Sequence, residues 1–575
     1  MEKEYKNLVL GCQNCKKDFI IEPDDFLFYE KIKVPAPTFC PECRLQRRQN
    51  FRNESTLYKT TCDMCGDSII TGYPKENNLK IYCNTCWYSD GWDPFGYKKD
   101  FNFNESFFNQ IKELKSQVPR LSFTNFQNEN CPYANYTWYS KNCYLTGSVL
   151  YSENIMYSRN VNKSVNCIDC LQIGDSEWCY ENIDSNKNYN SQFIFKSDNC
   201  IDSYFLVGCS SCKNCFMSSN LRNSNYVFYN KQLTKEEYLK EILNLNLNSY
   251  KNILNLIKDF NKIKNETIYK YSNILKSFNS TGNNIISSNN ILQSFDVRDS
   301  DNVRYGVRVS KTRNSMDINN MGTNCENFYD SINVGFDDSN YKFCTNSWGG
   351  CFNIEYCDLC FGSSHCFACI GLRNKQYCIL NKQYTKEQYE ELIPKIIKHM
   401  NDIPYIDSKG RVYKYGEFFP SELSPFAYNE TIAQEYFPLT KEQAISQGYR
   451  WKDKEVRNYN IDIHTEDIPD DISNIPDDIT SKVIECAHKG TCNQQCTEAF
   501  KIIPEELAFY KRMNLPIPRL CPNCRHYERL AERNPLKLWH RSCMKPGCTN
   551  EFETSYSPDR PEIIYCEKCY QQEVY

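Results

Sequence analysis

The two ends of this 575-residue chain carry the same pattern of cysteines, and this duplication constrains the fold more than any other feature. Three long intervals are equal at both ends: 25 positions for Cys15–Cys40 and Cys496–Cys521, 19 for Cys43–Cys62 and Cys524–Cys543, and 18 for Cys65–Cys83 and Cys548–Cys566. The residues between the cysteines also match, with FYEKIKVPAPTFCPECR beside FYKRMNLPIPRLCPNCR. The pattern indicates a module that has been duplicated.

Each copy predicts two successive zinc sites, because paired cysteines on tight turns supply four soft thiolate ligands. The predicted ligand sets are Cys12, Cys15, Cys40 and Cys43; Cys62, Cys65, Cys83 and Cys86; Cys492, Cys496, Cys521 and Cys524; and Cys543, Cys548, Cys566 and Cys569. Either Cys486 or His488, just upstream, could replace Cys492. Iron is the alternative metal, and free thiols or disulfides are the alternative to any metal. Four thiolates close the coordination sphere, so we expect about four zinc ions in structural roles.

The cysteine content, 34 residues, does not indicate a disulfide scaffold, because a chain of this length can bury a core without disulfides. The start, MEKEYKNLVLGCQNC, has no apolar leader, and no apolar run is long enough to span a membrane. We therefore expect a soluble, cytoplasmic protein in a reducing environment, without membrane contact; association with a particle is an alternative. The formal net charge of −4 excludes a simple polycation that coats nucleic acid.

The middle of the chain predicts a β-solenoid of two blocks. Aromatic or aliphatic anchors recur at nearly even intervals from Leu171 to Tyr226, and the same rhythm returns between Tyr305 and Phe352. Short strands with polar turns at this kind of spacing are typical of an all-β repeat, and similar units could stack on one another. If two such strands make one coil, each block gives four or five coils.

A helix is predicted to leave the end of each block. The blocks end alike, with LRNSNYVFYNKQLTKEEY and LRNKQYCILNKQYTKEQY identical at 11 of 18 positions. Thr234 with Glu237, and Thr385 with Gln388, form capping boxes. After the first block, an amphipathic stripe follows: Tyr250, Ile253, Leu254, Ile257 and Phe260. We expect these helices to cap the solenoid, with partner binding as the alternative.

The expected fold class is mainly β: duplicated pairs of zinc ribbons at both termini flank a two-block β-solenoid with capping helices. The predicted domains are zinc ribbon 1 (1–60), zinc ribbon 2 (61–100), a connecting segment (101–130), β-solenoid block 1 (131–233), a helical cap or insert (234–285), β-solenoid block 2 (286–384), a helix (385–404), an extended linker (405–482), zinc ribbon 3 (483–535) and zinc ribbon 4 (536–575). Two copies of IPDDI in the linker suggest an acidic tether, with a partner motif as the alternative.

Seventeen further cysteines lie in the middle region. Cysteine is among the most buried residue types, so these predict reduced thiols in the solenoid core, with additional metal binding or redox chemistry as alternatives. A catalytic thiolate would need a partner that lowers its pKa. Only His365 beside Cys366 suggests one, so no catalytic residue and no small-molecule substrate is predicted.

The chain turns basic after each CPxCR motif. The arginines concerned are Arg44, Arg47, Arg48, Arg52, Arg525, Arg529 and Arg533. Arginines at helical spacing could contact phosphates, and the nearby aromatic residues Phe51, Trp87, Tyr527 and Trp539 could stack on bases. Alternatively, the arginines neutralise the negative charge of the four-thiolate sites.

These motifs carry two resemblances. The first site of each pair, from its cysteine knuckle to CPxCR, resembles the short bacterial "probable zinc-ribbon" domain, which implies metal ligation by the matching cysteines and no activity. The whole order, from ribbon pair through solenoid to ribbon pair, resembles a family of uncharacterised cysteine-rich multi-zinc-ribbon proteins of uncultured small-genome bacteria and large DNA viruses. That resemblance implies no function.

We therefore expect a non-enzymatic zinc-binding scaffold or adaptor that contacts nucleic acid or a nucleoprotein through its terminal ribbons. The alternative is a structural or assembly protein that uses the solenoid face for protein contacts. A carbohydrate-active β-solenoid enzyme is a remote alternative, with Asp337, Asp338, Arg304 and Arg308 as candidates, although adjacent acids in a DDSN turn are usually turn residues. Neither the identity of the partner nor the oligomeric state follows from the sequence.

Overall fold

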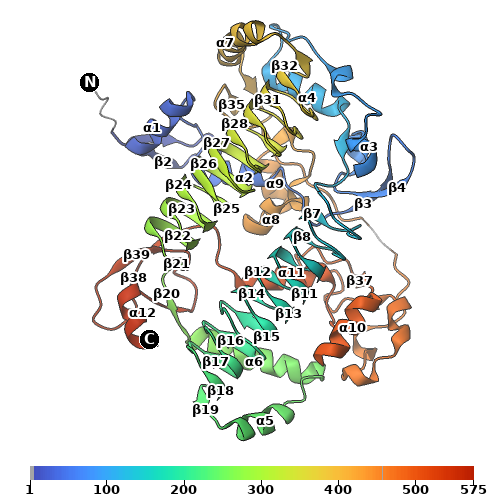
Figure 1. Ribbon diagram of the computed structural model, residues 1–575, viewed down its shortest axis with the longest axis vertical. Helices are drawn as coiled ribbons and strands as arrows, with labels where there is room; N and C mark the ends of the chain where they lie inside the picture. Colours follow the sequence, from blue (N-terminus) through green and yellow to red (C-terminus); the bar gives the residue numbers. More distant parts are fainter. Residues whose placement is uncertain (1–5, 456–457) are drawn as a thin grey trace. The chain divides into compact units, whose positions relative to one another are not determined.

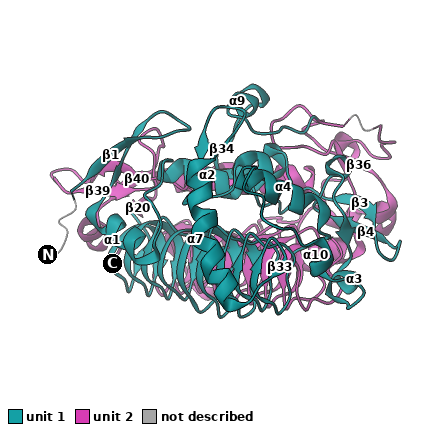
Figure 2. Ribbon diagram, turned by 90° about the horizontal axis from the view of Figure 1, so that it is seen from above, with its two compact units in different colours: residues 1–124, 272–453 teal, residues 125–271, 454–575 magenta. Residues whose placement is uncertain are grey.

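The computed structural model describes residues 6–455 and 458–575 and is mainly β, with 32% of residues in strands and 25% in helices. It divides into two compact units, each assembled from two separate stretches of chain (Figure 2). Unit 1 comprises Met1–Thr124 and Ser272–Asp453, and unit 2 comprises Asn125–Tyr271 and Lys454–Tyr575. Each unit therefore combines one cysteine-rich terminus with the strand-rich block that lies farther from it in sequence.

Outside their strand-rich blocks, the two units contain corresponding elements. Unit 1 has β1 (Leu8–Gly11), β2 (Asp18–Ile21), α1 (Pro23–Ile32), α2 (Pro41–Gln49), β3 (Tyr58–Thr61), β4 (Ser68–Thr71), β5 (Ile81–Tyr82), α3 (Asn84–Tyr88), α4 (Phe107–Gln117) and β6 (Arg120–Leu121). Unit 2 has α6 (Tyr250–Glu266), β20 (Ile268–Lys270), β36 (Ile484–Glu485), β37 (Ala499–Phe500), α10 (Pro504–Met513), α11 (Pro522–Glu532), β38 (Trp539–Ser542), β39 (Glu551–Thr554), β40 (Ile563–Tyr565) and α12 (Glu567–Val574).

The duplication extends to the segments that precede the strand-rich blocks. In unit 1, β5 pairs in parallel with β6, which follows helix α4. In unit 2, β40 pairs in parallel with β20, which follows helix α6. The helix–strand segment before each block is thus part of the other unit, where it completes the second cysteine-rich ribbon.

Each strand-rich block is a ladder of short, mostly parallel strands (Figure 1). Ladder 1, in unit 2, contains β7 (Asn135–Trp138), β8 (Gly147–Leu150), β9 (Glu153–Met156), β10 (Arg159–Asn162), β11 (Val165–Ile168), β12 (Leu171–Gly174), β13 (Glu177–Tyr180), β14 (Ile183–Asn186), β15 (Tyr189–Phe195), β16 (Tyr204–Val207), β17 (Lys213–Ser219), β18 (Asn225–Phe228) and β19 (Lys231–Gln232). Ladder 2, in unit 1, contains β21 (Ile274–Leu275), β22 (Phe278–Ile286), β23 (Asn289–Arg298), β24 (Asp301–Arg304), β25 (Val307–Ser310), β26 (Thr312–Met321), β27 (Cys325–Val334), β28 (Ser339–Lys342), β29 (Thr345–Ser347), β30 (Phe352–Glu355), β31 (Ser364–Phe367), β32 (Gln376–Ile379) and β33 (Lys382–Gln383).

Paired positions on parallel strands are 12 residues apart in ladder 1 and 11 to 13 residues apart in ladder 2. Arg159 pairs with Leu171, and Phe352 pairs with Ser364, both in parallel. In ladder 1, two strands occupy each interval, since β8 pairs with β10 and β9 pairs with β11. Four or five coils in each block is therefore too few, because one interval brings the chain to the next paired position.

The ladder backbone adopts a left-handed conformation at every third residue. In one stretch, Asn154, Tyr157, Asn160, Lys163 and Asn166 all have φ between 48° and 55°. Asparagine and aspartate tolerate this region better than other non-glycine residues, which accounts for much of the Asn and Asp content of the ladders. Successive asparagines also bond to one another: the amide of Asn154 donates to the side chain of Asn166 at 2.8 Å.

Serine and cysteine fill the same inward positions in the ladders. The hydroxyl of Ser152 accepts the backbone N–H of Ser164 at 3.1 Å, and the sulfur of Cys351 accepts that of Ser363 at 3.1 Å. Sixteen of the seventeen ladder cysteines are buried, and Cys131 is the one that is half-buried. The expectation of small buried core thiols is confirmed for these positions. Within the part of the chain that the structure describes, they form no cluster able to hold a metal ion.

The two predicted helix starts are confirmed. Helix α5 (Lys235–Leu243) begins after Thr234, whose hydroxyl accepts the N–H of Glu237, and α7 (Lys386–Asp402) begins in the same way after Thr385. Helix α6 packs on β16 and β17. Its predicted stripe is correct in part, because Leu256 is buried while Leu254 is exposed.

The region 405–482, expected to be an extended linker, contributes to both cores. It includes β34 (Tyr405–Ile406), β35 (Val412–Tyr413), α8 (Ile432–Tyr436) and α9 (Lys441–Ser446). In unit 1, Phe418 and Phe419 are fully buried. In unit 2, Ile468 and Ile475 of the two IPDDI copies are buried in the same core as helix α10. The IPDDI copies are therefore core elements, which corrects the expectation of a tether.

Candidate functional site

Four clusters of four cysteines could each hold a metal ion, and they are distributed as two in each unit. Their members are Cys12, Cys15, Cys40 and Cys43; Cys62, Cys65, Cys83 and Cys86; Cys486, Cys496, Cys521 and Cys524; and Cys543, Cys548, Cys566 and Cys569. The Sγ atoms of Cys15 and Cys40 are 3.8 Å apart, and those of Cys548 and Cys566 are 3.9 Å apart. Tetrahedral zinc with bonds of about 2.3 Å would hold its sulfurs about 3.8 Å apart.

The backbone around each cluster favours thiolates. The N–H of Cys40 donates to the sulfur of Cys12 at 3.3 Å, and Cys40 is also the N-cap of α2. A helix N-terminus stabilises negative charge. Hydrogen bonds from Cys40 and Cys43 hold the pKa of the Cys12 thiol well below its ordinary value. In the second cluster burial opposes ionisation, but backbone hydrogen bonds lower the pKa of Cys62 to about 7.

In the third cluster, Cys486 takes the place that the sequence analysis gave to Cys492. The N–H of Cys521 donates to the sulfur of Cys486 at 3.2 Å, just as the N–H of Cys40 donates to Cys12. Strands β36 and β37 flank Cys486 and Cys496 as β1 and β2 flank Cys12 and Cys15. Residues 487–495 stand where the first knuckle has only Gln13 and Asn14, so this knuckle contains an insertion. The cysteine intervals that match between the two termini did not reveal the insertion, because they begin at Cys496 and the insertion lies before it.

The insertion brings further ligands to the third cluster. Cys492 and His488 form a group with Cys524, and the Cys492 and Cys524 sulfurs are 3.7 Å apart. Nδ1 of His488 is buried and has no hydrogen-bond partner in the part of the chain that the structure describes. Unlike the first cluster, this cluster therefore has spare ligands.

The arginines after the first CPxCR motif lie against ladder 2, where α2 contacts β26 and β27. Arg44 bonds to Asp317 at 2.8 Å, and Arg48 reaches both Asp317 at 3.2 Å and Asp330 at 2.6 Å. The side chains of Arg48 and Asp317 are both 0% exposed. One helical turn further along, Arg52 bonds to Asn333. Arginines spaced by four residues thus meet polar side chains on successive ladder positions.

Unit 2 repeats this arrangement on ladder 1. Arg525 pairs with Asp169, and Arg529 pairs with Asp169 at 2.9 Å. Arg529 also pairs with Glu181 at 3.0 Å, and Arg533 pairs with Asp184 at 2.8 Å. When CPECR is aligned with CPNCR, each arginine corresponds to Arg44, Arg48 or Arg52. We call each set an arginine row: Arg44, Arg48 and Arg52 in unit 1, and Arg525, Arg529 and Arg533 in unit 2.

This placement does not support the predicted nucleic-acid contacts. All seven arginines, including Arg47, which bonds to Asp330 and Glu417 at 3.2 Å each, are buried and paired with side chains of their own unit. Two of the proposed stacking residues, Phe51 and Trp87, are also buried. The sequence contains a sign of this pairing. Asp169 and Glu181, like Asp317 and Asp330, are separated by about the interval between paired ladder positions.

The second ribbon of each pair contacts the end of the same ladder. Arg373, in the shared LRN motif of ladder 2, donates to the carbonyl of Trp87 at 2.9 Å. Arg222, in the same motif of ladder 1, donates to the hydroxyl of Tyr570 at 2.9 Å. Trp87 and Tyr570 each follow the last cysteine of their cluster. The repeated LRN motif therefore positions the ribbons.

The remaining candidates are part of the structure rather than of a reactive site. Arg304 pairs with Asp25 at 2.7 Å, and Asp338 accepts the backbone N–H of Phe336 at 2.7 Å. Arg308 bonds to the hydroxyl of Tyr436, and Asp337 accepts the amide of Asn324 at 2.8 Å. Cys366 is fully buried, and burial raises its pKa well above the ordinary value, whereas a reactive thiolate needs a lowered one. The ring of His365 stacks on Tyr377.

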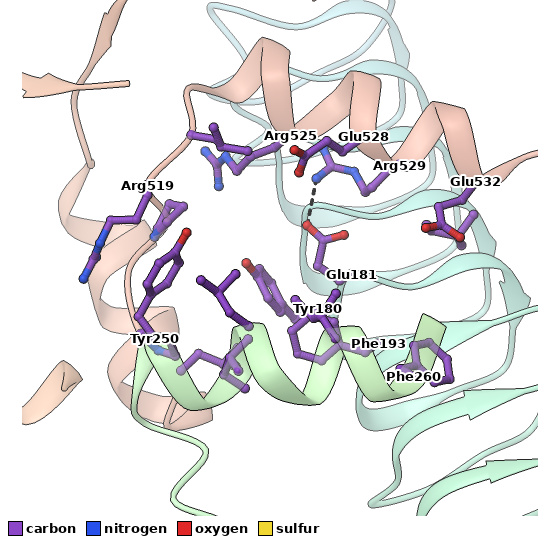
Figure 3. Close-up of a pocket in the computed structure, with 18 of the residues that line it drawn as sticks. Tyr180, Glu181, Phe193, Tyr250, Phe260, Arg519, Arg525, Glu528, Arg529 and Glu532 are labelled. Atoms are coloured by element: carbon purple, nitrogen blue, oxygen red, sulfur yellow. Dashed lines mark hydrogen bonds and ion pairs between the residues drawn. The ribbon is translucent and has the colours of Figure 1, made fainter. Parts of the chain in front are cut away.

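Unit 2 contains a cavity of about 430 Å³ between α6, α11 and ladder 1 (Figure 3). Tyr250 and Phe260 of α6 line one wall, and Tyr180 and Phe193 of the ladder line another. The remaining walls come from residues 515–520 and from α11, which contributes carboxylates and guanidiniums. The cavity is therefore apolar along α6 and charged along α11.

Comparisons with known proteins give no family. No protein-family model and no curated protein matches the chain. Among solved structures, it is similar at 10% identity and a TM-score of 0.11 to a "putative acetyltransferase" from Desulfovibrio desulfuricans G20, over 51% of this chain and 75% of that one. A likeness this weak carries no argument about fold or activity. Among the described residues, no helix is long and apolar enough to cross a membrane.

Proposed function

We propose that the protein is a non-enzymatic, zinc-stabilised scaffold in which two pairs of zinc ribbons brace two β-solenoids. The observation that carries the proposal is that one assembly is built twice: a four-cysteine cluster, the helix that follows it, and an arginine row buried against a ladder. The metal sites are thus coupled to the ladders by Cys40 and Cys521, which begin those helices.

Zinc is the proposed metal because the four-cysteine clusters offer only soft thiolate ligands at tetrahedral spacing. A closed four-thiolate sphere leaves no position for a substrate, which supports structural rather than catalytic sites. The regular interval between paired positions, together with left-handed residues at every third position, supports a β-solenoid for each ladder. The proposal assigns no phosphate contact to the buried arginines.

Elemental analysis combined with proteolysis tests this function. Purified full-length protein should contain close to four zinc ions per chain. Chelation should first expose residues 6–124 and 483–575 to protease, because the ribbons lose their ligands while the ladders keep their internal hydrogen bonds. A preparation with iron in place of zinc, or ribbons that stay protected after complete metal removal, would contradict the proposal.

A further inference from the structure

The unit 2 cavity has a counterpart in unit 1 that the chain itself fills. When Cys40 is aligned with Cys521, Thr38, Arg47 and Phe51 correspond to Arg519, Glu528 and Glu532. The last three line the cavity. The first three all contact one segment of unit 1, residues 415–419, with the sequence YGEFF. The internal duplication therefore shows what kind of chain fits this space.

The unit 1 segment is held by its backbone shape and its aromatic rings. Gly416 has φ of 101°, and a Cβ there would lie 2.4 Å from Pro35, whose counterpart Pro516 lines the cavity. The ring centroid of Phe418 is 5.3 Å from that of Phe51. That of Phe419 is 6.3 Å from Phe108, on α4. These contacts require an extended segment with two adjacent aromatic residues after a glycine.

A carboxylate fixes the polar end of the same segment. Glu417 accepts the backbone N–H of Thr38 at 2.8 Å and pairs with Arg47 at 3.2 Å. Glu528 stands at the position of Arg47 in unit 2 and carries no hydrogen bond or ion pair within the described residues. Glu181 and Glu532 line the same space (Figure 3), where they pair with Arg529 and Lys264. A residue in the place of Glu417 would therefore meet the carboxylate of Glu528 where unit 1 has the guanidinium of Arg47, so a cation fits this position.

We propose that the unit 2 cavity binds an extended segment of a partner protein in which a basic residue precedes two aromatic residues. The basic residue pairs with Glu528, and the aromatic side chains pack on the apolar wall formed by Ile253, Ile257 and Phe260 of α6. This inference rests on the proposed scaffold role and gives the scaffold one specific kind of partner. The bound segment would reproduce in unit 2 the packing that residues 415–419 provide in unit 1.

Fluorescence anisotropy with two labelled peptides tests the proposal on the zinc-loaded full-length protein. Both peptides have the sequence of residues 411–422, and one carries Glu417→Lys. We expect the lysine peptide to bind at least 10-fold more tightly than the native peptide. The variant Glu528→Arg should reverse this preference and bind the native peptide more tightly than the lysine peptide. A misfolded protein could not gain this binding.

A second variant tests the location. Ile257→Trp fills the cavity and should abolish binding, whereas Ile406→Trp adds the same bulk at a position of unit 1 that is 60% exposed and should leave binding unchanged. Absence of binding by both peptides, equal binding of both, or unchanged binding to Ile257→Trp would overturn the proposal. Zinc analysis of the same preparations distinguishes failure of peptide binding from failure of the scaffold. If the scaffold proposal fails, the zinc count will lie clearly below four ions per chain.

Discussion

The two units use the same arginine rows but differ in the charge and the space around them. In unit 1, Arg44, Arg47 and Arg48 face three carboxylates, those of Asp317, Asp330 and Glu417. In unit 2, two guanidiniums face three carboxylates, because Arg525 and Arg529 meet Asp169, Glu181 and Glu506. The unit with balanced charges also holds the YGEFF segment, and the other holds a cavity. The arginine row is therefore common to both units, whereas the segment beside it is not.

The excess carboxylate of unit 2 has an electrostatic consequence. Burial raises the pKa of Glu181 to about 8, although Arg529 opposes the shift. Burial likewise raises the pKa of Glu506, which accepts a hydrogen bond from the hydroxyl of Tyr157 at 2.7 Å. A buried carboxyl beside other carboxylates holds a proton more tightly than one in water.

The largest expected difference between the units concerns their first metal sites. Cys12→Ser should reduce the zinc count from four to three, because cluster 1 has no spare ligand among the described residues. Cys486→Ser should keep the count near four, because Cys492 and His488 lie beside Cys524. Since a structural zinc contributes roughly 10 kcal/mol or more to the folding of its site, the two variants should also differ strongly in thermal stability. Equal zinc loss in both would break this comparison.

Removing the central aspartate of either arginine row should destabilise only its own unit. Asp317→Ala in unit 1 removes the carboxylate that Arg44 and Arg48 share, and Asp169→Ala in unit 2 removes the one that Arg525 and Arg529 share. Breaking a buried pair costs about 3–5 kcal/mol. Hydrogen exchange should rise in α2 for the first variant and in α11 for the second. Variant Asp337→Ala, which changes an acid outside the rows, serves as the control, and an equal effect from it would refute the assignment.

The space filled by residues 415–419 in unit 1 and the cavity in unit 2 can be compared by truncating one side chain in each. Phe419→Ala should cost about 3–5 kcal/mol, as expected for a buried aromatic residue. Ile257→Ala should cost less than about 2 kcal/mol, because Ile257 already borders a cavity and loses fewer contacts. Thermal unfolding of the two variants measures the difference. Equal losses would mean that the cavity is packed as tightly as its counterpart.

The smallest expected effect is the pH dependence of unit 2. A carboxyl whose pKa is raised by folding stabilises the native state below its unfolded pKa of about 4.3, and this contribution is lost as the pH rises through the folded pKa. For Glu181 the loss extends to about pH 8. Hydrogen exchange in α11 should therefore quicken from pH 5 to pH 8 beyond its intrinsic rise, and Glu181→Gln should remove that excess. An excess unchanged in the variant would contradict the assignment.

The sequence predicted the parts of this molecule whose spacing is local. Four cysteine clusters and the capping boxes at Thr234 and Thr385 follow from short patterns, because knuckles and N-caps depend on neighbouring residues. The length of one turn was misjudged, because apolar anchors do not report the left-handed residues that bend the ladder backbone. Cys486 was predicted only as an alternative to Cys492, because an insertion separates it from Cys496.

The docking of the ribbons could not be predicted from composition. Arg48 and Asp317 are 0% exposed, yet both residue types are usually found on surfaces. Their partnership becomes evident only when two patterns are compared: the spacing of arginines by one helical turn after CPxCR, and the spacing of acids by one ladder turn in the distant strands. An arginine-rich helix beside a zinc cluster therefore does not by itself indicate nucleic-acid binding.

A double-mutant cycle on Arg48 and Asp317 tests the central claim most directly. The single variants Arg48→Met and Asp317→Leu each remove one charge of the buried pair and leave its partner with one ion pair fewer, whereas the double variant removes both charges. We predict that the double variant is less destabilised than the sum of the singles by about 2 kcal/mol, as expected for contacting residues. Additive effects within about 0.5 kcal/mol would show that the ribbon helix does not dock on ladder 2 and would contradict the account.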